Sequence, residues 1–261
     1  MLSLKDIRYL GKQKKARDTQ GLFVAEGIKL FEEAPPALIE QVVMTRSFAE
    51  EHPDIRARIP KGAAVSDDLD EARFFGISDT KTPQGILCVL RKPEWNYSEI
   101  LNHPAPLFVF TEDLQDPGNA GTILRTAEAA GANAVFFTEN TVDVLSPKVV
   151  RSTMGSVFRV PHFQVKDTEA FFNELRGKGI KTYAAHLRGR ANYTDVSYLG
   201  GSLFVIGNES RGITDETAAL CDMLIRIPMM GRVESLNAAM AAGVLMYEAQ
   251  RQRRLRTEST L

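Results

Sequence analysis

Several features that mark large classes of protein are absent or scarce in this chain. It has only two cysteines in 261 residues, with no CxxC pair and no neighbouring histidine. A disulfide framework or a zinc site is therefore not expected, and we predict that Cys88 and Cys221 are reduced core residues. The histidines also lack the spacing of metal ligands, so we expect no bound metal; they are His52, His103, His162 and His186.

Long apolar runs are absent as well. No stretch approaches the roughly 18 consecutive apolar residues that a membrane-spanning helix needs. The N-terminal sequence MLSLKDIRYLGKQKKAR has no apolar signal core behind its charges. With 44% hydrophobic and 25% charged residues, the composition is that of a globular protein with a packed core. We therefore expect a cytoplasmic protein.

Three motifs of widespread enzyme classes are missing too. There is no GxGxxG after a strand, no GxxxxGK followed by Ser or Thr, and no GxSxG. An ordinary dinucleotide-binding turn, a P-loop and the nucleophile elbow of α/β-hydrolases are therefore not supported. Any catalytic site must be built from other residues.

The net charge is −1, but the charges are unevenly distributed. Within the first 17 positions a single Asp6 is opposed by Lys5, Arg8, Lys12, Lys14, Lys15 and Arg17. A basic cluster on a helix is typical of contact with the phosphate backbone of a nucleic acid. The alternative is a solvated helix face. The candidates for nucleic-acid contact are Lys12, Lys14, Lys15 and Arg17.

The alternation of apolar patterns predicts two α/β units joined by a linker. Residues 1–92 alternate helices with short strands, beginning with one helix over residues 3–18. Residues 93–106 contain prolines and asparagines with little periodicity, which is typical of a linker. Residues 107–261 alternate again, with longer and more apolar strands.

The second unit is predicted to contain a mainly parallel sheet with helices on both faces. Its near-continuous apolar strands, separated by helices, favour this arrangement. The strands are expected within residues 106–113, 133–140, 181–187, 202–209 and 223–229. The last helix, over residues 236–256, is rich in small residues, which favours burial in the core or at a subunit interface.

The first candidate segment follows the strand at residues 106–113. Asn119 is expected to cap the next helix, and Arg125 is expected on its first turn or two. A guanidinium at this position can clamp a phosphate through two hydrogen bonds. The alternative is a surface arginine on a helix that Asn119 merely caps.

Two further segments follow later strands. Gly207 allows a tight turn that places the Glu209 carboxylate at its mouth, and Ser235 is expected to cap the last helix. Taken alone, these would be a turn with an ion pair and a capped helix start. Because open α/β folds build ligand sites at the carboxyl ends of parallel strands, the three segments together predict one site.

The sequence resembles the SpoU/TrmH family at these three segments. NxGxxxR at residues 119–125, IGNESRGI at 206–213 and IPMxGxxxSLN at 227–237 occur in the order and spacing of the family's motifs. Residues 3–34 and 77–90 are similar to the family's N-terminal substrate-binding domain, which has a ribosomal-protein-like α/β fold. Members of this family, in the SPOUT superfamily, are S-adenosylmethionine-dependent RNA ribose 2′-O-methyltransferases.

The resemblance implies a trefoil-knotted catalytic domain, a homodimer and a set of site residues. S-adenosylmethionine would be contacted, largely by backbone groups, at Gly207, Ile227 and Leu236. The catalytic and RNA-facing set would be Asn119, Arg125, Glu209, Ser235 and Asn237. Because a guanidinium stays protonated in proteins, we expect Arg125 to hold the target phosphate and stabilise developing negative charge, with Asn119, Asn237 and Glu209 fixing the geometry.

The full N-terminal domain is usual in the rRNA-directed branch of the family, so 23S rRNA is the favoured substrate. A tRNA 2′-O-methyltransferase is the nearest alternative. A catalytically silent rRNA-binding protein also remains open, as does a methyltransferase acting on a small molecule or a protein. S-adenosylmethionine binding would separate the silent protein from the enzymes.

Overall fold

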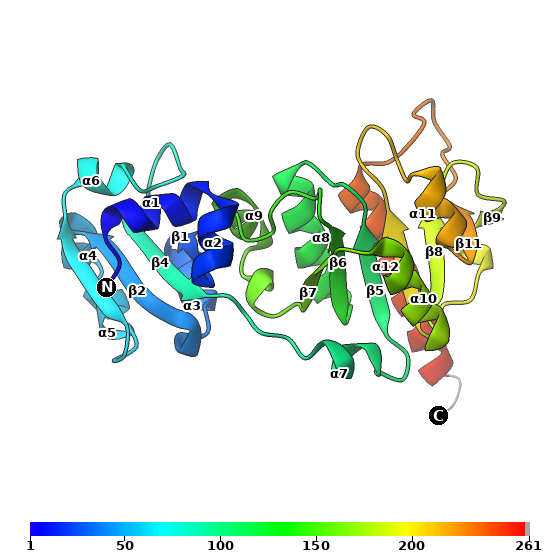
Figure 1. Cartoon of the computed structure of the whole chain (residues 1–261), viewed down its shortest axis with the longest axis horizontal. Coiled ribbons are helices and arrows are strands. Elements are labelled where there is room, and N and C mark those ends of the chain that lie inside the picture. Colours follow the sequence, from blue (N-terminus) through cyan, green and yellow to red (C-terminus); the bar gives the residue numbers. More distant parts are fainter. Residues whose placement is uncertain (259–261) are drawn as a thin grey trace. The chain divides into compact units, whose positions relative to one another are not determined.

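The computed structural model describes residues 1–258, so the last three residues of the predicted catalytic domain lie outside the described part (Figure 1). The chain divides into two compact units. The N-terminal unit contains Met1–Glu94 and Asp143–Phe158, and the C-terminal unit contains Trp95–Val142 and the chain from Arg159 onward. A segment from the middle of the chain therefore belongs to the N-terminal unit, which periodicity within residues 1–92 gave no means of predicting.

The N-terminal unit is built on a mixed four-stranded sheet of order β1-β4-β2-β3. The β1–β4 and β2–β4 pairs are antiparallel, and β2–β3 is parallel. Its elements are α1 (Leu4–Lys12), α2 (Lys14–Gln20), β1 (Leu22–Glu26), α3 (Ile28–Glu33), η1 (Pro36–Leu38), β2 (Ile39–Thr45), α4 (Arg46–Glu51), α5 (Pro53–Ala57), β3 (Ala64–Leu69), α6 (Glu71–Phe75), β4 (Ile86–Arg91), α9 (Pro147–Thr153) and η2 (Ser156–Phe158).

The helix predicted over residues 3–18 is two helices. A capping box starts α1: the Ser3 hydroxyl accepts from the Asp6 N–H, and the Asp6 carboxylate accepts from the Ser3 N–H. The helix ends at Gln13, whose backbone is extended with φ of −124°. The prediction of one continuous helix was therefore wrong at this single residue.

The inserted segment, residues 143–158, completes one core of the N-terminal unit. Val150, Val157 and Phe158 are buried in the same cluster as Phe23 of β1. The rings of Phe23 and Phe158 lie 6.2 Å apart. Strand β1 therefore buries part of its apolar face against residues more than 100 positions away in the chain.

Arg17 is buried and has a structural role, contrary to its predicted contact with nucleic acid. Its side chain is 4% exposed and forms an ion pair with Asp143, with its Nε donating to Oδ2 of Asp143 at 2.7 Å. The guanidinium also donates to the carbonyl of Leu10. This pair fixes α2 to the inserted segment, so the guanidinium is not presented to solvent.

The C-terminal unit contains a seven-stranded sheet of order β7-β6-β5-β10-β8-β11-β9, in which every pair is parallel. This confirms the mainly parallel α/β prediction. Its elements are α7 (Tyr97–Leu101), β5 (Leu107–Thr111), α8 (Pro117–Ala129), β6 (Ala134–Thr138), β7 (His162–Val165), α10 (Thr168–Gly177), β8 (Lys181–Ala185), β9 (Ala191–Asn192), η3 (Tyr193–Asp195), β10 (Ser202–Ile206), α11 (Asp215–Leu220), β11 (Met223–Arg226) and α12 (Ala238–Glu258).

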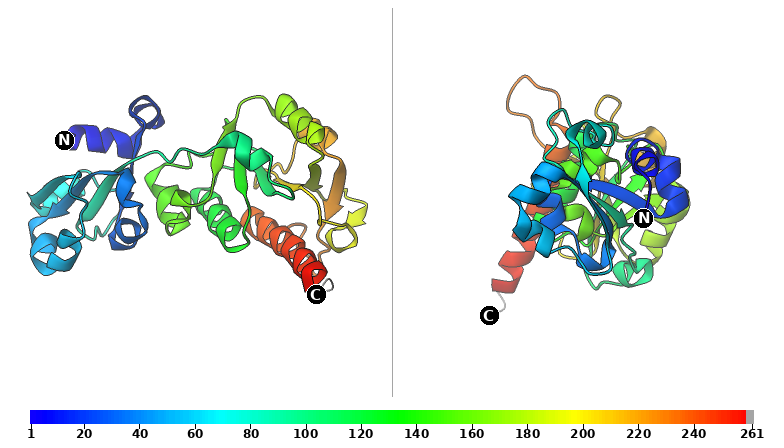
Figure 2. Two further views of the ribbon diagram at one scale, coloured as in Figure 1. Left: turned by 90° about the horizontal axis from the view of Figure 1, so that it is seen from below. Right: turned by 90° about the vertical axis from the view of Figure 1, so that its left-hand side faces the viewer.

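Helices cover both faces of this sheet. α8 and α12 pack against each other, and α12 also packs on β5 and β10; Figure 2 shows them side by side. α10 and α11 pack together and contribute Phe171, Phe172 and Ala218 to the core with Phe108 and Phe110 of β5. The central strands β5, β6 and β10 are therefore buried on both sides. The trefoil knot stays a prediction.

Three elements of this unit were missed. β7 has only Val165 buried and β9 has two residues, so neither shows the apolar run of a core strand. The predicted linker contains α7, which begins at the cap Asn96, whose side chain accepts from the Glu99 N–H at 3.2 Å. Short or edge elements of this kind carry little periodicity.

Both cysteines are free, as predicted. Cys88 is buried in β4, whereas Cys221 is only partly buried at the end of α11. Within residues 1–258, no helix has the length and apolar character to cross a membrane.

The Arg17–Asp143 pair provides a test of this packing. Asp143→Asn should lower the free energy of unfolding by about 3 kcal/mol, because it leaves a buried guanidinium without its counter-charge. Denaturant unfolding of the full chain measures this. The double variant Arg17→Met, Asp143→Leu should recover most of the loss, and a loss below about 1 kcal/mol in Asp143→Asn would contradict the assigned role.

Candidate functional site

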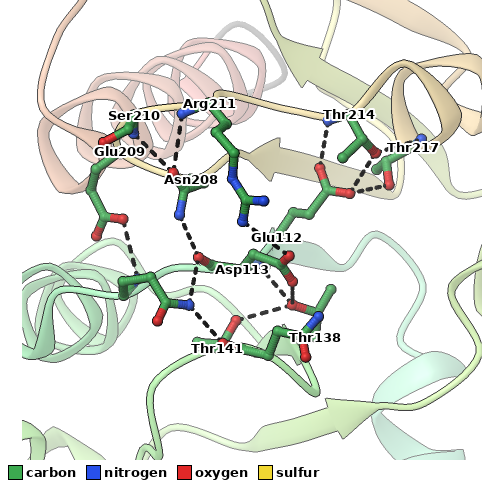
Figure 3. Close-up of polar contacts among 12 residues, drawn as sticks. Glu112, Asp113, Thr138, Thr141, Asn208, Glu209, Ser210, Arg211, Thr214 and Thr217 are labelled. Carbon is green, nitrogen blue, oxygen red and sulfur yellow. Dashed lines mark hydrogen bonds and ion pairs between the residues drawn. The ribbon is translucent and has the colours of Figure 1, made fainter.

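The three segments singled out in the sequence meet at the carboxyl ends of β5, β10 and β11. β5 and β10 are parallel neighbours, with Thr111 opposite Ile206. The two strands therefore end at the same edge of the sheet, and the loops that follow them begin there. The polar side chains that follow these two strands face one another across this edge (Figure 3).

The first segment folds into the start of α8, which begins three residues earlier than predicted. Asp116 is the N-cap: its Oδ1 accepts from the Asn119 N–H at 2.8 Å. Pro117 occupies the first helical position, where its fixed φ fits and its missing N–H costs nothing. The prediction that Asn119 caps this helix was wrong. Asn119 is instead a buried residue of the first turn, with its amide free for other contacts.

The carboxylate of Glu209 joins the second segment to the first. It accepts hydrogen bonds from the backbone N–H groups of Gln115 at 3.1 Å and Asp116 at 2.9 Å. It also accepts from Nδ2 of Asn119 at 3.0 Å. Burial alone would raise the pKa of Glu209, but the hydrogen bonds from Asn119, Asp116 and Gln115 outweigh it and hold this pKa below its usual value. Glu209 is therefore an ionised acceptor and a poor proton acceptor.

The amide of Asn119 extends this connection to the third segment. Its Oδ1 accepts from Nδ2 of Asn237 at 2.8 Å. Oδ1 of Asn237 in turn accepts from the N–H groups of Ala239 and Met240, so Asn237 caps α12. The predicted cap at Ser235 was wrong. We call these three linked side chains the Glu209–Asn119–Asn237 chain; it ties all three segments together.

A second polar network, which the sequence did not reveal, lies beneath the turn of the second segment. Asp113 has a positive φ of 52°, and its carbonyl accepts from Nδ2 of Asn208 at 2.7 Å. Its carboxylate accepts from Oγ1 of Thr138 at 2.8 Å. Oδ1 of Asn208 then accepts from the N–H groups of Ser210 and Arg211. Figure 3 shows these contacts converging on Asp113.

Glu112 fixes the far end of the same turn. This buried carboxylate accepts from the N–H and the hydroxyl of Thr214, at 2.9 and 2.7 Å, and from the hydroxyl of Thr217 at 2.5 Å. The only sequence signal for this role was the pair of acidic residues directly after an apolar strand. Together, Glu112 and Asp113 hold residues 208–214 in one conformation.

Gly207 is required by a close backbone approach in this turn. A Cβ at this position would lie 2.2 Å from the carbonyl carbon of Gly212 and 2.3 Å from the nitrogen of Ile213. No side chain fits there without moving backbone. The two sides of the turn therefore pack backbone against backbone, and residues 206–215 line the space beside them.

That space is a cavity of about 1050 Å³. It is lined by residues 185–188, 206–215, 226–229 and 234–236, together with Ala238 and Ala241. The wall thus includes the predicted cofactor-contacting residues Gly207, Ile227 and Leu236. It also includes Glu209 and Ser235, whereas Asn119, Arg125 and Asn237 are not part of the wall.

Arg125 lies further along α8 than predicted. It is the ninth residue of the helix, in the third turn, because α8 begins at Pro117. Its side chain is exposed, and no residue in 1–258 forms a hydrogen bond or ion pair with it. Six residues along a helix span about 9 Å, so Arg125 stands clear of the Glu209–Asn119–Asn237 chain. Its guanidinium is available to a ligand outside the protein.

His186, one of the four histidines without metal-ligand spacing, lies in the wall of the cavity. Burial, and then the charge of Arg188, lower the pKa of this imidazole below its ordinary value. The ring is therefore neutral at physiological pH. Its Nδ1 accepts from the N–H of Arg188 at 3.0 Å, which fixes the direction in which the ring faces.

The three lysines of the basic cluster are exposed. Lys12 ends α1, and Lys14 and Lys15 begin α2. Unlike Arg17, they are accessible to a phosphate backbone. For a metal, no group of three or more His, Cys, Asp or Glu residues suited to hold an ion occurs in the described part of the chain.

Comparison with known proteins matches two separate regions of the chain. Residues 106–247 match the SpoU rRNA Methylase family, and residues 3–88 match the MRM3-like substrate binding domain. The 23S rRNA (guanosine(2553)-2'-O)-methyltransferase RlmP of Bacillus subtilis is 31% identical over 239 residues, covering 90% of each chain.

Some solved structures are similar to nearly the whole chain, and others to a smaller part of it. An AdoMet-bound rRNA methyltransferase from Sinorhizobium meliloti is 34% identical with a TM-score of 0.82, covering 95% of this chain and 94% of that one. The A. aeolicus TrmH/SpoU tRNA modifying enzyme is 28% identical with a TM-score of 0.53, covering 61% of this chain and 81% of that one.

The lowered pKa of Glu209 gives a testable dependence on pH. Because the pKa is lower in the folded than in the unfolded chain, the carboxylate contributes stability that is complete above the unfolded value of about 4.3. That contribution is lost as the pH falls through the folded pKa. The difference in free energy of unfolding between the native chain and Glu209→Gln should therefore be constant from about pH 8 to about pH 6, and should shrink below about pH 4.3. A difference that grows on acidification would contradict the ionised assignment.

Proposed function

The chain belongs to the SpoU rRNA Methylase family, and we propose that it transfers the methyl group of S-adenosylmethionine to a ribose 2′-hydroxyl of 23S rRNA. It is an S-adenosylmethionine-dependent RNA methyltransferase, as its relatives and structural neighbours are. The observation that carries the proposal is the Glu209–Asn119–Asn237 chain, which joins the three segments of the family's motifs, the second and third of which line the cavity.

The cavity fits S-adenosylmethionine in size and in the chemistry of its wall. Its volume of about 1050 Å³ is at the upper end of the range of small-ligand pockets. Gly207 exposes peptide groups, and Ile227 and Leu236 add apolar side chains. We assign these three residues to cofactor binding. When bound, S-adenosylmethionine supplies an electrophilic methyl group.

The remaining site residues act on the RNA and on the geometry of the site. Glu209 is held by three N–H groups and has a low pKa, so it positions the loops and does not remove the proton. Asn119 and Asn237 transmit this order to α8 and α12. The free guanidinium of Arg125 binds the target phosphate and stabilises negative charge on the attacking oxygen. Ser235 lies at the edge of the cavity, where the RNA would enter.

The N-terminal unit is assigned to rRNA binding. It matches the MRM3-like substrate binding domain, and the exposed Lys12, Lys14 and Lys15 offer charge to a phosphate backbone. The rRNA-directed relatives are similar along nearly the whole chain, whereas the tRNA enzyme is similar over 61% of it. This difference in coverage favours rRNA over tRNA as the substrate.

We also propose a homodimer formed through α12. The exposed apolar side chains Met240, Tyr247 and Leu255 are spaced along this helix, at intervals of seven and eight residues that place them on one face. Its other face, with Ala242, Leu245 and Met246, is buried in the unit's own core. A second copy of the helix would cover the exposed face.

The proposed reaction predicts where the methyl group is found. Purified chain incubated with methyl-labelled S-adenosylmethionine and unmodified 23S rRNA should place the label in alkali-resistant dinucleotides, because a 2′-O-methyl group blocks cleavage of the next phosphodiester. Unmodified tRNA should acquire no label. Label in alkali-released mononucleotides would indicate base methylation and contradict the proposal.

The close approach at Gly207 predicts the effect of a single methyl group on cofactor binding. Gly207→Ala should abolish detectable binding of S-adenosylmethionine in calorimetry, since the Cβ would displace the backbone of residues 212 and 213. Gly200→Ala is the matched control, because a Cβ there meets nothing within 4 Å. Equal affinity in the two variants would remove Gly207 from the cofactor site.

The bidentate role of Arg125 predicts that its charge alone is insufficient. Arg125→Lys should lower the single-turnover methylation rate by about 100-fold, the lower end of the loss expected for an electrostatic group at a transition state. The affinity for S-adenosylmethionine should not change. A near-normal rate in Arg125→Lys would show that the planar guanidinium is not needed.

A further inference from the structure

A second cavity, of about 390 Å³, lies within the N-terminal unit. It is formed where the start of α3, the helices α4 and α6, and the loop before β4 come together. The side chains that matter for its chemistry are Ser47, Phe48, Glu51, His52, Glu71 and Phe75. None of them takes part in the site described above.

The floor of this cavity is fixed by backbone packing. Gly85 has a φ of +86°, and a Cβ there would lie 2.8 Å from Oγ1 of Thr45 and 2.9 Å from Cβ of Phe48. Its carbonyl accepts from the N–H of Thr45 at 2.9 Å. The loop before β4 therefore lies directly on the start of α4.

The same loop is fixed at its other end by a buried carboxylate. Glu26 is 7% exposed, and it accepts from the hydroxyls of Ser78 and Thr80, both at 2.7 Å, and from the N–H of Asp79 at 3.0 Å. Burying a carboxylate is costly unless it is fully hydrogen-bonded. Both carboxylate oxygens of Glu26 thus bind the loop and hold it in one conformation.

Aromatic and imidazole rings are part of the cavity wall. Phe75 is 58% exposed, which is unusual for so large an apolar side chain. The ring of His52 packs on that of Phe48, with centroids 4.4 Å apart. Exposed aromatic and imidazole rings are the surfaces on which proteins stack unpaired RNA bases.

Carboxylates face the same space. The hydroxyl of Ser47 donates to Oε1 of Glu71 at 2.7 Å and lies 3.1 Å from Oγ1 of Thr45. This hydrogen bond from Ser47 lowers the pKa of Glu71 below its usual value, so the carboxylate only accepts hydrogen bonds at neutral pH. Glu51 adds a second carboxylate. Carboxylates repel a phosphate but accept hydrogen bonds from the N–H groups of a base.

Each segment that forms the cavity has a basic residue close to it in the sequence. Lys29 follows Ile28, Arg46 precedes Ser47, Arg73 precedes Phe74, and Lys81 lies two positions before Pro83; all four are exposed. Lys29 also pairs with Glu33. Hydrogen-bond acceptors therefore line the cavity, and cations lie next to these residues in the sequence. This pattern suits a nucleotide whose base enters the cavity and whose flanking phosphates stay outside.

We propose that this cavity binds one unpaired guanine of the RNA substrate, stacked against Phe75 and His52 and hydrogen-bonded to Glu71. Guanine alone among the RNA bases presents two neighbouring N–H donors, at N1 and N2, to the two oxygens of a carboxylate. Recognition of a base splayed out of a loop or bulge is the usual way in which proteins read RNA sequence. The proposal rests on the RNA substrate of the proposed function, but not on methyl transfer.

The test compares two labelled RNA heptamers, one with six uridines and a central guanosine and one of uridine only. Fluorescence anisotropy with the full chain should show about tenfold tighter binding of the guanosine heptamer, the size expected from one stacked base. Phe75→Ala and Glu71→Gln should each reduce this preference to near unity. Both residues are exposed, so the variants should fold normally, and thermal unfolding checks this.

Two controls separate base recognition from general RNA affinity. Val65→Ala removes an exposed apolar side chain outside the cavity, and it should keep the preference. Replacing Lys12, Lys14 and Lys15 by alanine should weaken binding of both heptamers equally, because phosphate contacts carry no base information.

Equal affinity of the native chain for the two heptamers, no saturable binding of either, or an unchanged preference in both cavity variants would each overturn the proposal. S-adenosylmethionine calorimetry and rRNA methylation on the same preparations keep the two proposals distinct. A chain that prefers the guanosine heptamer but methylates no rRNA would retain the cavity and lose the proposed function. A chain that methylates rRNA but does not prefer the guanosine heptamer would retain the proposed function and lose the proposed base site.

Discussion

The carboxylate of Glu209 is the interaction on which the arrangement of the site depends. Three loops leave the sheet at one edge, and side-chain hydrogen bonds join all three of them. Glu209 supplies one acceptor group for two backbone N–H groups and for the amide of Asn119. Asn119 then reaches Asn237 at the start of α12. Because each of these three side chains bonds to at least two partners, the relative positions of the three segments are closely restricted.

This constraint separates two tasks within the site. The side chains of the Glu209–Asn119–Asn237 chain fix the loops, and the lowered pKa of Glu209 makes it a poor proton acceptor. They lie behind or at the wall of the cavity. Arg125, on the same helix as Asn119, is uncommitted and exposed. Methyl transfer from a reactive sulfonium requires chiefly that the nucleophile be placed and its developing charge be stabilised. The fixed loops would place S-adenosylmethionine, and the guanidinium of Arg125 would bind the RNA. Together they satisfy that requirement.

The sequence predicted the broad architecture well because it depends on local pattern. The five predicted strands of the C-terminal unit are mostly apolar, and the three polar segments were found from their glycine and polar residues after predicted strands and from the order and spacing of the family's motifs. The helix starts were placed wrongly at both Asn119 and Ser235. In each case two or three neighbouring residues can cap a helix, and only the three-dimensional contacts decide which does so: Asp116 and Asn237. The buried position of Arg17 depends on Asp143, 126 residues later, and the roles of Glu112 and Asp113 depend on partners at 138 and 208–217. Local pattern contains no information about such pairs.

The most direct test of the constraint is calorimetric titration of S-adenosylmethionine into two variants, Asn119→Ala and Arg125→Ala. Neither residue lines the cavity, so a contact-based view would expect equal and nearly native affinities. We expect Asn119→Ala to weaken binding by about tenfold, the value of one or two lost hydrogen bonds, because it disconnects Glu209 from Asn237. Arg125→Ala should bind as the native chain does. Native affinity in Asn119→Ala, or a comparable loss in Arg125→Ala, would contradict the account.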